Sequence, residues 1–164
     1  MEFLKDLFQN KALIAAVLAW LFAQLIKTVI CAVVSKKLQM ERMWGAGGMP
    51  SAHSSMVCAL AIATARFYGA DSPIFALSLV LALVTIYDAM GVRREAGRHA
   101  KVLNHYLNGL ELDKAETEEE AVEFETIDLK ELIGHTPMQV IMGAIFGIVY
   151  AFYMHLMVFA SNVN

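Results

Sequence analysis

Cysteine is scarce in this sequence, and its two thiols are poorly placed for cross-links or metal binding. Cys31 and Cys58 each lie inside an apolar segment. We expect buried thiols rather than a disulfide framework, and the sequence shows no zinc-site spacing. A Walker loop, a nucleic-acid-binding motif and an internal repeat are also missing. These absences predict no cofactor, no metal and no nucleic-acid partner.

Charged residues are also few. They make up 18% of the 164 residues, whereas 58% are hydrophobic, which is too apolar for an ordinary soluble domain. The composition is typical of an integral membrane protein, and the length predicts one domain over residues 1–164. The N-terminal residues 1–6 lack the basic start of a secretory signal, and the apolar segment after them is too long for a signal core. We therefore expect that segment to remain as an anchor.

Four apolar segments predict an all-α fold, an integral membrane helical bundle with about four transmembrane helices. They cover residues 12–34, 51–68, 74–90 and 137–159. Residues 1–10 carry apolar side chains at helical spacing and predict a short interfacial helix. The second segment is rich in alanine and serine, so we expect it to be central rather than lipid-facing. Gly143 and Gly147 form a G-x-x-x-G pair suited to close helix contact.

Charge is unevenly distributed along the chain. The net formal charge is −3, but residues 109–131 hold ten acidic residues against two lysines, a local charge of −8 that leaves +5 elsewhere. Such a run is usually solvated, so we predict an acidic loop at about 109–127. Basic residues follow the first and third apolar segments and are fewer on the other side, so the positive-inside rule places the motif-bearing loops in the cytoplasm. The first group is Lys36, Lys37, Arg42, Arg93, Arg94, Arg98 and Lys101, and the second is Lys5, Lys11 and Arg66.

A polar stretch at residues 47–55 separates the first two apolar segments and reads Gly-Gly-Met-Pro-Ser-Ala-His-Ser-Ser. Pro50 falls at the start of the next helix, whose opening amides favour an anion, and His53 can move a proton there. The alternative interpretation is a helix-capping turn with an incidental histidine. His135 stands beside Pro137 in a similar position at the last helix. His155 has no polar neighbour in the sequence, and we interpret it as structural.

Two groups of basic residues each leave two interpretations open. Lys27 shares a helical face with Gln24; it either faces the protein interior, as costly intramembrane lysines usually do, or extends to the membrane surface. Arg94, Arg98 and Lys101 also share a helical face. Their cationic groups either clasp a phosphate or contact anionic lipid headgroups.

Two histidines, arginines and helix N-termini together are suited to phosphoryl transfer. The motifs that carry them resemble a known family. Gly-Gly-Met-Pro-Ser-Ala-His at 47–53 is similar to the P-S-G-H motif of the type 2 phosphatidic acid phosphatase superfamily, which also contains vanadium haloperoxidases. Residues 134–140 with Gly143 and Gly147 are similar to its last motif, H-x-x-x-D-V-x-x-G, and residues 87–94 resemble a divergent bacterial and plant branch.

The resemblance implies a role for each matching residue. His135 matches the nucleophile that becomes a phosphohistidine, and His53 matches the acid–base histidine. Ser51 matches a phosphate-binding serine. Lys27, with Lys36 and Lys37 as alternatives, matches the lysine of the first family motif. The family arginine would come from Arg93, Arg94 or Arg98.

Three positions depart from the family pattern. Ala52 replaces the glycine before the second-motif histidine, and no arginine stands six to seven residues before His135. Gln139 occupies the place of the aspartate that orients the nucleophile, and an amide does not stabilise imidazolium by charge. The carboxylates that would substitute for it are Asp88, Asp128 and Glu131.

The resemblance therefore implies a membrane-embedded phosphatase-like protein of a bacterial cytoplasmic (inner) membrane. It would hydrolyse a lipid phosphate or pyrophosphate through a phosphohistidine. The alternative is a non-catalytic membrane protein that keeps the fold and binds phosphate or lipid headgroups, or acts in transport or assembly. The predicted partners of the protein are the membrane and a lipid phosphate. Four short helices are few to enclose a site, which leaves a homo-oligomer open.

Overall fold

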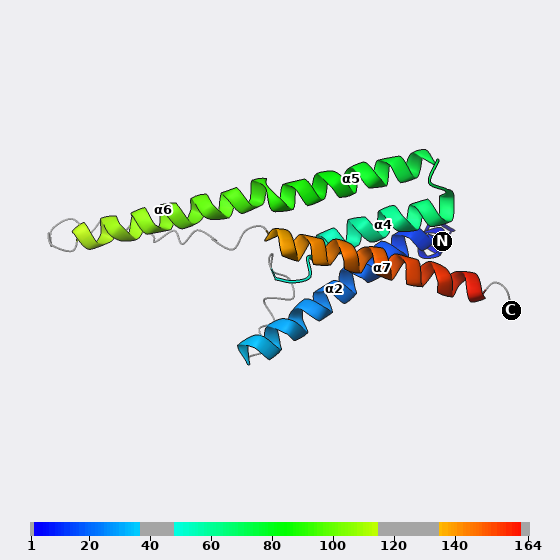
Figure 1. Cartoon of the computed structure of the whole chain (residues 1–164), viewed down its shortest axis with the longest axis horizontal. Coiled ribbons are helices and arrows are strands. Elements are labelled where there is room, and N and C mark those ends of the chain that lie inside the picture. The colour runs from blue at the N-terminus through cyan, green and yellow to red at the C-terminus, as the bar shows by residue number, and fades with distance from the viewer. Residues whose placement is uncertain (1, 37–47, 115–134, 162–164) are drawn as a thin grey trace.

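A computed structural model describes residues 2–36, 48–114 and 135–161. Within these ranges the chain is helical and contains no strand, as the sequence predicts (Figure 1). The helices are α1 (Glu2–Gln9), α2 (Lys11–Ser35), α4 (Ala52–Tyr68), α5 (Pro73–Met90), α6 (Val92–Lys114) and α7 (Pro137–Ser161). The all-α membrane bundle is therefore confirmed.

Three helical stretches in the described residues are long and apolar enough to cross a membrane. They are Lys11–Ser35, Pro73–Tyr106 and Pro137–Val158. The fourth predicted span corresponds to α4, which has 17 residues and lies inside the bundle, packed against α2, α5 and α7. The expectation that this alanine- and serine-rich segment is central is correct.

Small side chains explain why the helices approach α4 so closely. Ala19 of α2 meets Ala59 of α4 and Ala151 of α7 in one buried cluster, and Ala15 meets Ala63 in another. The pairing shows that α2 runs antiparallel to α4. On the α5 side, a buried hydrogen bond of 2.7 Å joins the hydroxyls of Thr64 and Ser78.

The two glycines of the G-x-x-x-G pair bring α7 against the backbone of α4. A Cβ atom at Gly143 would stand 2.4 Å from the carbonyl oxygen of Ser51, and one at Gly147 would stand 2.2 Å from that of Ser55. No side chain fits at such distances. The Ser55 hydroxyl also donates to the Gly143 carbonyl at 2.9 Å. The predicted close contact is therefore made, and α4 and α7 run parallel with their N-termini at one end.

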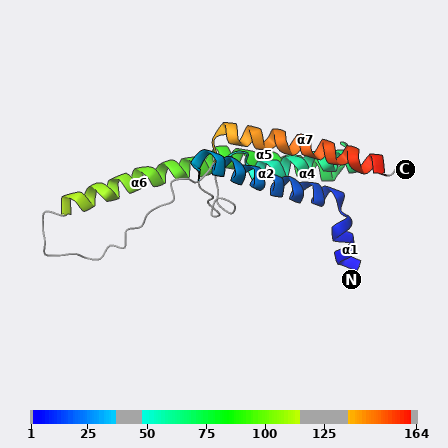
Figure 2. The same ribbon diagram turned by 90° about the horizontal axis from the view of Figure 1, so that it is seen from below.

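Helix starts follow the capping chemistry of the sequence. Asn10, Ser51 and Ser72 are the N-caps of α2, α4 and α5, and each side chain accepts from a backbone N–H three residues later. Pro73 occupies the first turn of α5, where the missing N–H costs nothing. At Asn10 the chain turns, so that α1 points away from the bundle (Figure 2). Phe3 and Phe8 on this short helix are exposed.

One predicted boundary is wrong. The acidic loop was expected to begin near residue 109, but α6 continues to Lys114, and residues 109–114 are helical. The sequence Leu-Glu-Leu-Asp-Lys at 110–114 contains mostly good helix formers, so the negative charge does not end the helix. The remainder of the predicted loop, 115–127, lies outside the described residues. Beyond the bundle, α6 continues roughly in the direction of α5 (Figure 1).

Candidate active site at the N-termini of α4 and α7

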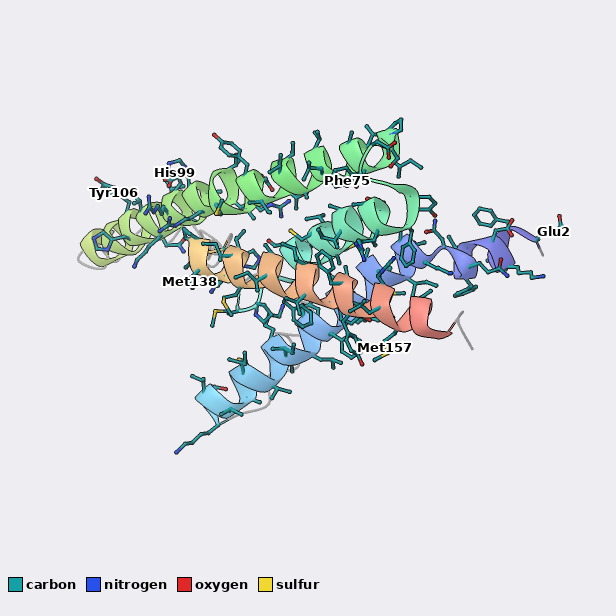
Figure 3. All side chains as sticks on the ribbon, turned by 45° about the vertical axis from the view of Figure 1, so that its right-hand side comes forward. Glu2, Phe75, His99, Tyr106, Met138 and Met157 are labelled. Carbon is teal, nitrogen blue, oxygen red and sulfur yellow. The ribbon has the colours of Figure 1, made fainter. Side chains whose placement is uncertain are left out.

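Two backbone hydrogen bonds gather the predicted motifs at one end of the bundle. The N–H of Ser51, before α4, donates to the carbonyl of Gln139 in α7 at 3.0 Å. The N–H of His135 donates to the carbonyl of Ala89, at the end of α5, at 3.2 Å. The starts of α4, α6 and α7 therefore meet the end of α5. Met138 in Figure 3 marks this end of α7.

The start of α7 is a capping box. The N–H of Gln139 donates to the Thr136 hydroxyl at 3.4 Å, and the N–H of Thr136 donates to Oε1 of Gln139 at 3.1 Å. Because a backbone N–H requires an acceptor, this second bond fixes which end of the Gln139 amide is oxygen. Gln139 therefore has a structural reason to be present, independent of any chemistry.

The same amide oxygen determines the tautomer of His135. Nδ1 of His135 lies 3.3 Å from Oε1 of Gln139. Since that oxygen only accepts, Nδ1 must carry the hydrogen, and Nε2 of the neutral ring keeps a lone pair. The residue that replaces the family aspartate still orients the imidazole, although without a negative charge.

His135 is held in its neutral form. Its side chain is 8% exposed, and burial is the main cause that lowers its pKa below the ordinary 6.5. The hydrogen bond to Gln139 opposes this by raising the pKa. The positive charges of His53, Lys27 and Arg93 act in the same direction as burial and lower the pKa further.

His53 lies in the first turn of α4 and has an exposed side chain. The packing around it still removes enough water to lower its pKa below 6.5, and the charges of Arg93 and Lys27 act in the same direction. The charges of Arg93 and Lys27 thus lower the pKa of both imidazoles.

Lys27 faces the protein interior. The residue is 5% exposed although it belongs to the membrane-crossing helix α2. Its aliphatic stem passes beside Gly48, where a Cβ atom would stand 2.9 Å from Cδ of the lysine. Gly48 also has a φ of 89°, a conformation that L side chains rarely adopt. Lys36 and Lys37 are the alternatives to Lys27 for the lysine of the first family motif. Lys36 is exposed at the end of α2, and Lys37 lies outside the described residues.

The three candidate arginines are placed differently. Nε of Arg93 donates to Oδ2 of Asp88, an ion pair that joins α5 to α6. This bond leaves the two terminal nitrogens of the guanidinium to meet a phosphate. Arg98 forms an exposed ion pair with Glu95 at 2.8 Å. Neither Arg98 nor Arg94 is among the charges that act on the two histidines.

Asp88 therefore contacts an arginine rather than the nucleophile that it was expected to orient. The other two carboxylates considered for that role, Asp128 and Glu131, lie outside the described residues. Within the described residues, no group of three histidine, cysteine, aspartate or glutamate side chains could hold a metal ion.

Ser51 is fully buried beneath the site. Its hydroxyl accepts from the Ser54 hydroxyl at 3.0 Å and from the Ser54 N–H at 3.4 Å, and its carbonyl accepts from Ser55. These bonds fix the start of α4 against α7. The contact between Ser51 and phosphate stays a prediction.

Sequence reasoning assigned no individual role to two residues of the quoted motifs, Thr136 and Gly48. Thr136 has a readable signal, because T-x-x-Q before an apolar run is a capping-box pattern. Gly48 has only a weak signal, because its partner Lys27 is distant in sequence.

Comparison with known proteins identifies the family of the chain. Residues 8–150 match the family described as the "Divergent PAP2 family". The chain belongs to the divergent PAP2 family. It is 40% identical over 146 residues to the "Uncharacterized membrane protein YuiD" of Bacillus subtilis, a match that covers 87% of this chain and 92% of that protein. No solved structure matches the chain significantly.

Membership confirms the resemblance to the divergent branch of the superfamily. Both predicted histidine motifs fall inside the matched residues, as do α2, α4, α5 and α6. In this member of the divergent PAP2 family, the two histidine motifs lie on neighbouring parallel helices.

Proposed function

We propose that this divergent PAP2 protein hydrolyses a lipid phosphate or pyrophosphate through a phosphohistidine at His135. The observation that carries the proposal is the hydrogen bond from Nδ1 of His135 to Gln139. It leaves Nε2 with a lone pair at a site where Lys27 and Arg93 supply positive charge. A neutral, oriented imidazole among cations is suited to attack on an anionic phosphorus centre.

The reaction would proceed in two steps. Nε2 of His135 attacks phosphorus, the bond from phosphorus to the lipid oxygen breaks, and protonated His53 gives its proton to that oxygen. Neutral His53 then takes a proton from water, whose oxygen attacks phosphorus, and the phosphorus–nitrogen bond breaks to release inorganic phosphate. Lys27 and the terminal nitrogens of Arg93 would stabilise the equatorial oxygens.

Bound phosphate would also favour the protonated form of His53 that the first step requires. In the free protein, burial and nearby cations lower the pKa of His53, which opposes its role as an acid. A phosphate dianion offsets the charges of Lys27 and Arg93 and thereby favours the protonated ring. Substrate binding would therefore raise the pKa of His53 and allow it to act as the general acid.

The test is phosphate release from a panel of lipid phosphates in detergent micelles. We expect His135→Ala to abolish turnover, and His53→Ala to reduce it by about two to four decades, the usual range for a general acid or base. Arg98→Gln removes an exposed ion pair. Because Arg98 is not among the charges that act on the two histidines, the turnover of this variant tests whether the phosphate site extends to Arg98. Turnover that persists in His135→Ala would refute the assignment of the nucleophile.

A second candidate function is phosphate or lipid-headgroup binding without turnover. It is favoured by the Gln139 amide, which orients His135 but does not stabilise the imidazolium by charge. In that case a lipid phosphate would bind, and binding would weaken in Lys27→Met and Arg93→Gln, while no phosphate is released by the wild-type protein.

We also propose that the two-histidine end faces the cytoplasm of a bacterial inner membrane. Lys101 follows Arg93, Arg94 and Arg98 on α6, whereas the N-terminal end of the chain carries fewer basic residues. In a variant with both native cysteines replaced, a cysteine introduced at Glu118 should resist a membrane-impermeant thiol reagent in intact cells, and Lys5→Cys should react. The opposite labelling would reverse the orientation.

A further inference from the structure

A second basic cluster lies at the other end of the bundle from the two histidines. Arg66, in the last turn of α4, has a terminal nitrogen 3.4 Å from Nδ1 of His155 in α7. The guanidinium carbon also lies 5.5 Å from the ring centroid of Phe152. Because His53 and Arg66 are 13 residues apart on one helix, the two sites are separated by about 20 Å along the axis.

Lys11, the first residue of α2, joins the same cluster. Its ammonium lies 5.8 Å from the ring centroid of Phe67, and that ring lies 5.1 Å from the ring of His155. Three helices that are distant in sequence thus bring two cations together around three rings. We call Lys11, Arg66, Phe67, Phe152 and His155 the Arg66 cluster.

Lys11 and Arg66 give the cluster two positive charges, and neither forms an ion pair with one of the described residues. The ion pairs among them, Arg93–Asp88 and Arg98–Glu95, both lie at the other end of the bundle. Arg66 and Lys11 instead contact ring faces, which attract a cation without cancelling its charge. An anion placed between them would gain two charge-assisted contacts.

The position of the cluster indicates which class of anion can reach it. Lys11 begins one membrane-crossing stretch, and His155 lies three residues before the end of another. This is the depth of the lipid headgroups. Exposed apolar side chains of α7, including Phe152 and Leu156, provide a surface for an acyl chain beside the cluster, and Met157 marks this end of α7 in Figure 3.

We propose that the Arg66 cluster binds the headgroup of an anionic bilayer phospholipid, in the leaflet opposite the two-histidine site. The phosphodiester lies between the guanidinium of Arg66 and the ammonium of Lys11. Phe67 and Phe152 hold the two cations in place through their ring faces. The lipid is a structural ligand of the bundle and does not react.

The test is native mass spectrometry of the full-length protein in detergent, titrated with phosphatidylglycerol or phosphatidylcholine of the same acyl chains. We expect tighter binding of phosphatidylglycerol, and Arg66→Gln should weaken it by about five-fold, the equivalent of one basic residue near a membrane surface. Lys5→Gln, which removes one charge from α1 at the same end, should leave the affinity unchanged. The five-fold loss in Arg66→Gln should be the same in an Arg93→Gln background, which separates this site from the proposed phosphatase site.

Equal affinity for the two lipids, or equal loss in Arg66→Gln and Lys5→Gln, would overturn the proposal. So would full competition by inorganic phosphate at matched concentration, because the ligand would then be a free anion. If Arg66→Gln does not yield folded protein, Lys11→Gln replaces it, since that side chain is exposed.

Discussion

Replacing Gly143 with alanine should separate α7 from α4 and thereby displace the two histidines. The new Cβ atom would stand 2.4 Å from the Ser51 carbonyl oxygen, whereas ordinary contact begins at 3.4 Å. The obstacle is backbone, so a side-chain rotation does not relieve it, and α7 must move by about 1 Å. That movement stretches the bond between the Ser51 N–H and the Gln139 carbonyl.

The cost can be estimated from two contributions. Overpacking of a close interface costs about 1–3 kcal/mol. Each weakened interhelical hydrogen bond costs about 0.6 kcal/mol in a membrane protein. We expect the free energy of unfolding to fall by about 2–4 kcal/mol. A displacement of about 1 Å at the reacting groups should also lower turnover by about 100-fold.

The assays are unfolding in mixed micelles and phosphate release by the folded fraction. Gly147→Ala is the matched control, because its Cβ would stand 2.2 Å from the Ser55 carbonyl but one turn farther from the histidines. It should lose similar stability with a smaller loss of turnover. Ile145→Ala, on the exposed face between the two glycines, should change neither by much. If Gly143→Ala leaves stability unchanged, the helices are not in backbone contact and the reasoning fails.

Three further outcomes are expected. Gln139→Glu keeps the geometry of the capping box and adds a carboxylate beside Nδ1, so turnover should rise by about tenfold or more; an unchanged rate would mean that a missing carboxylate does not limit the reaction. The pKa values of His53 and His135 are both lowered from 6.5, and the reaction needs one ring protonated and the other neutral. The profile of kcat/KM against pH should therefore peak below 6.5 and fall on both sides, and a maximum near pH 8 would contradict the roles. Gly48→Ala should raise KM for the lipid phosphate more than it lowers kcat, because the strained backbone displaces Lys27; equal effects would argue against a binding role for that lysine.

The helices were predictable because their signals are local. Apolar runs of adequate length determine α2, α5 and α7, and an asparagine, serine or proline beside each start fixes the boundary within a few residues. The wrong prediction that the acidic loop begins near residue 109 also comes from a local signal. Charge patterning predicts solvation, and a solvated segment with high helix propensity remains helical when it continues an existing helix.

The candidate site was only partly predictable because its geometry depends on contacts between distant segments. Both histidines were recognisable from their motifs. Arg93, Arg94 and Arg98 were all candidates, and the sequence did not indicate that Arg93 alone of these three acts on both rings, since that depends on how α6 leaves α5. The burial of Lys27 depends on Gly48, 21 positions later. His155 was interpreted as structural because Arg66 is 89 residues away in the sequence.

The central position of α4 has a consequence for how the protein enters the membrane. The helix has 17 residues and is not one of the described stretches long and apolar enough to cross a membrane, and the side chains that it buries are mostly alanine, serine and threonine. It is joined to α5 by the short turn 69–72, so the two can insert together as a hairpin whose lipophilic arm is α5. Until α7 has been synthesised, the face of α4 that carries Ser51 and Ser55 is without its partner. The arrival of α7 therefore completes both the packing of α4 and the candidate active site, so a ribosome-bound chain that lacks α7 should be a target for membrane quality control.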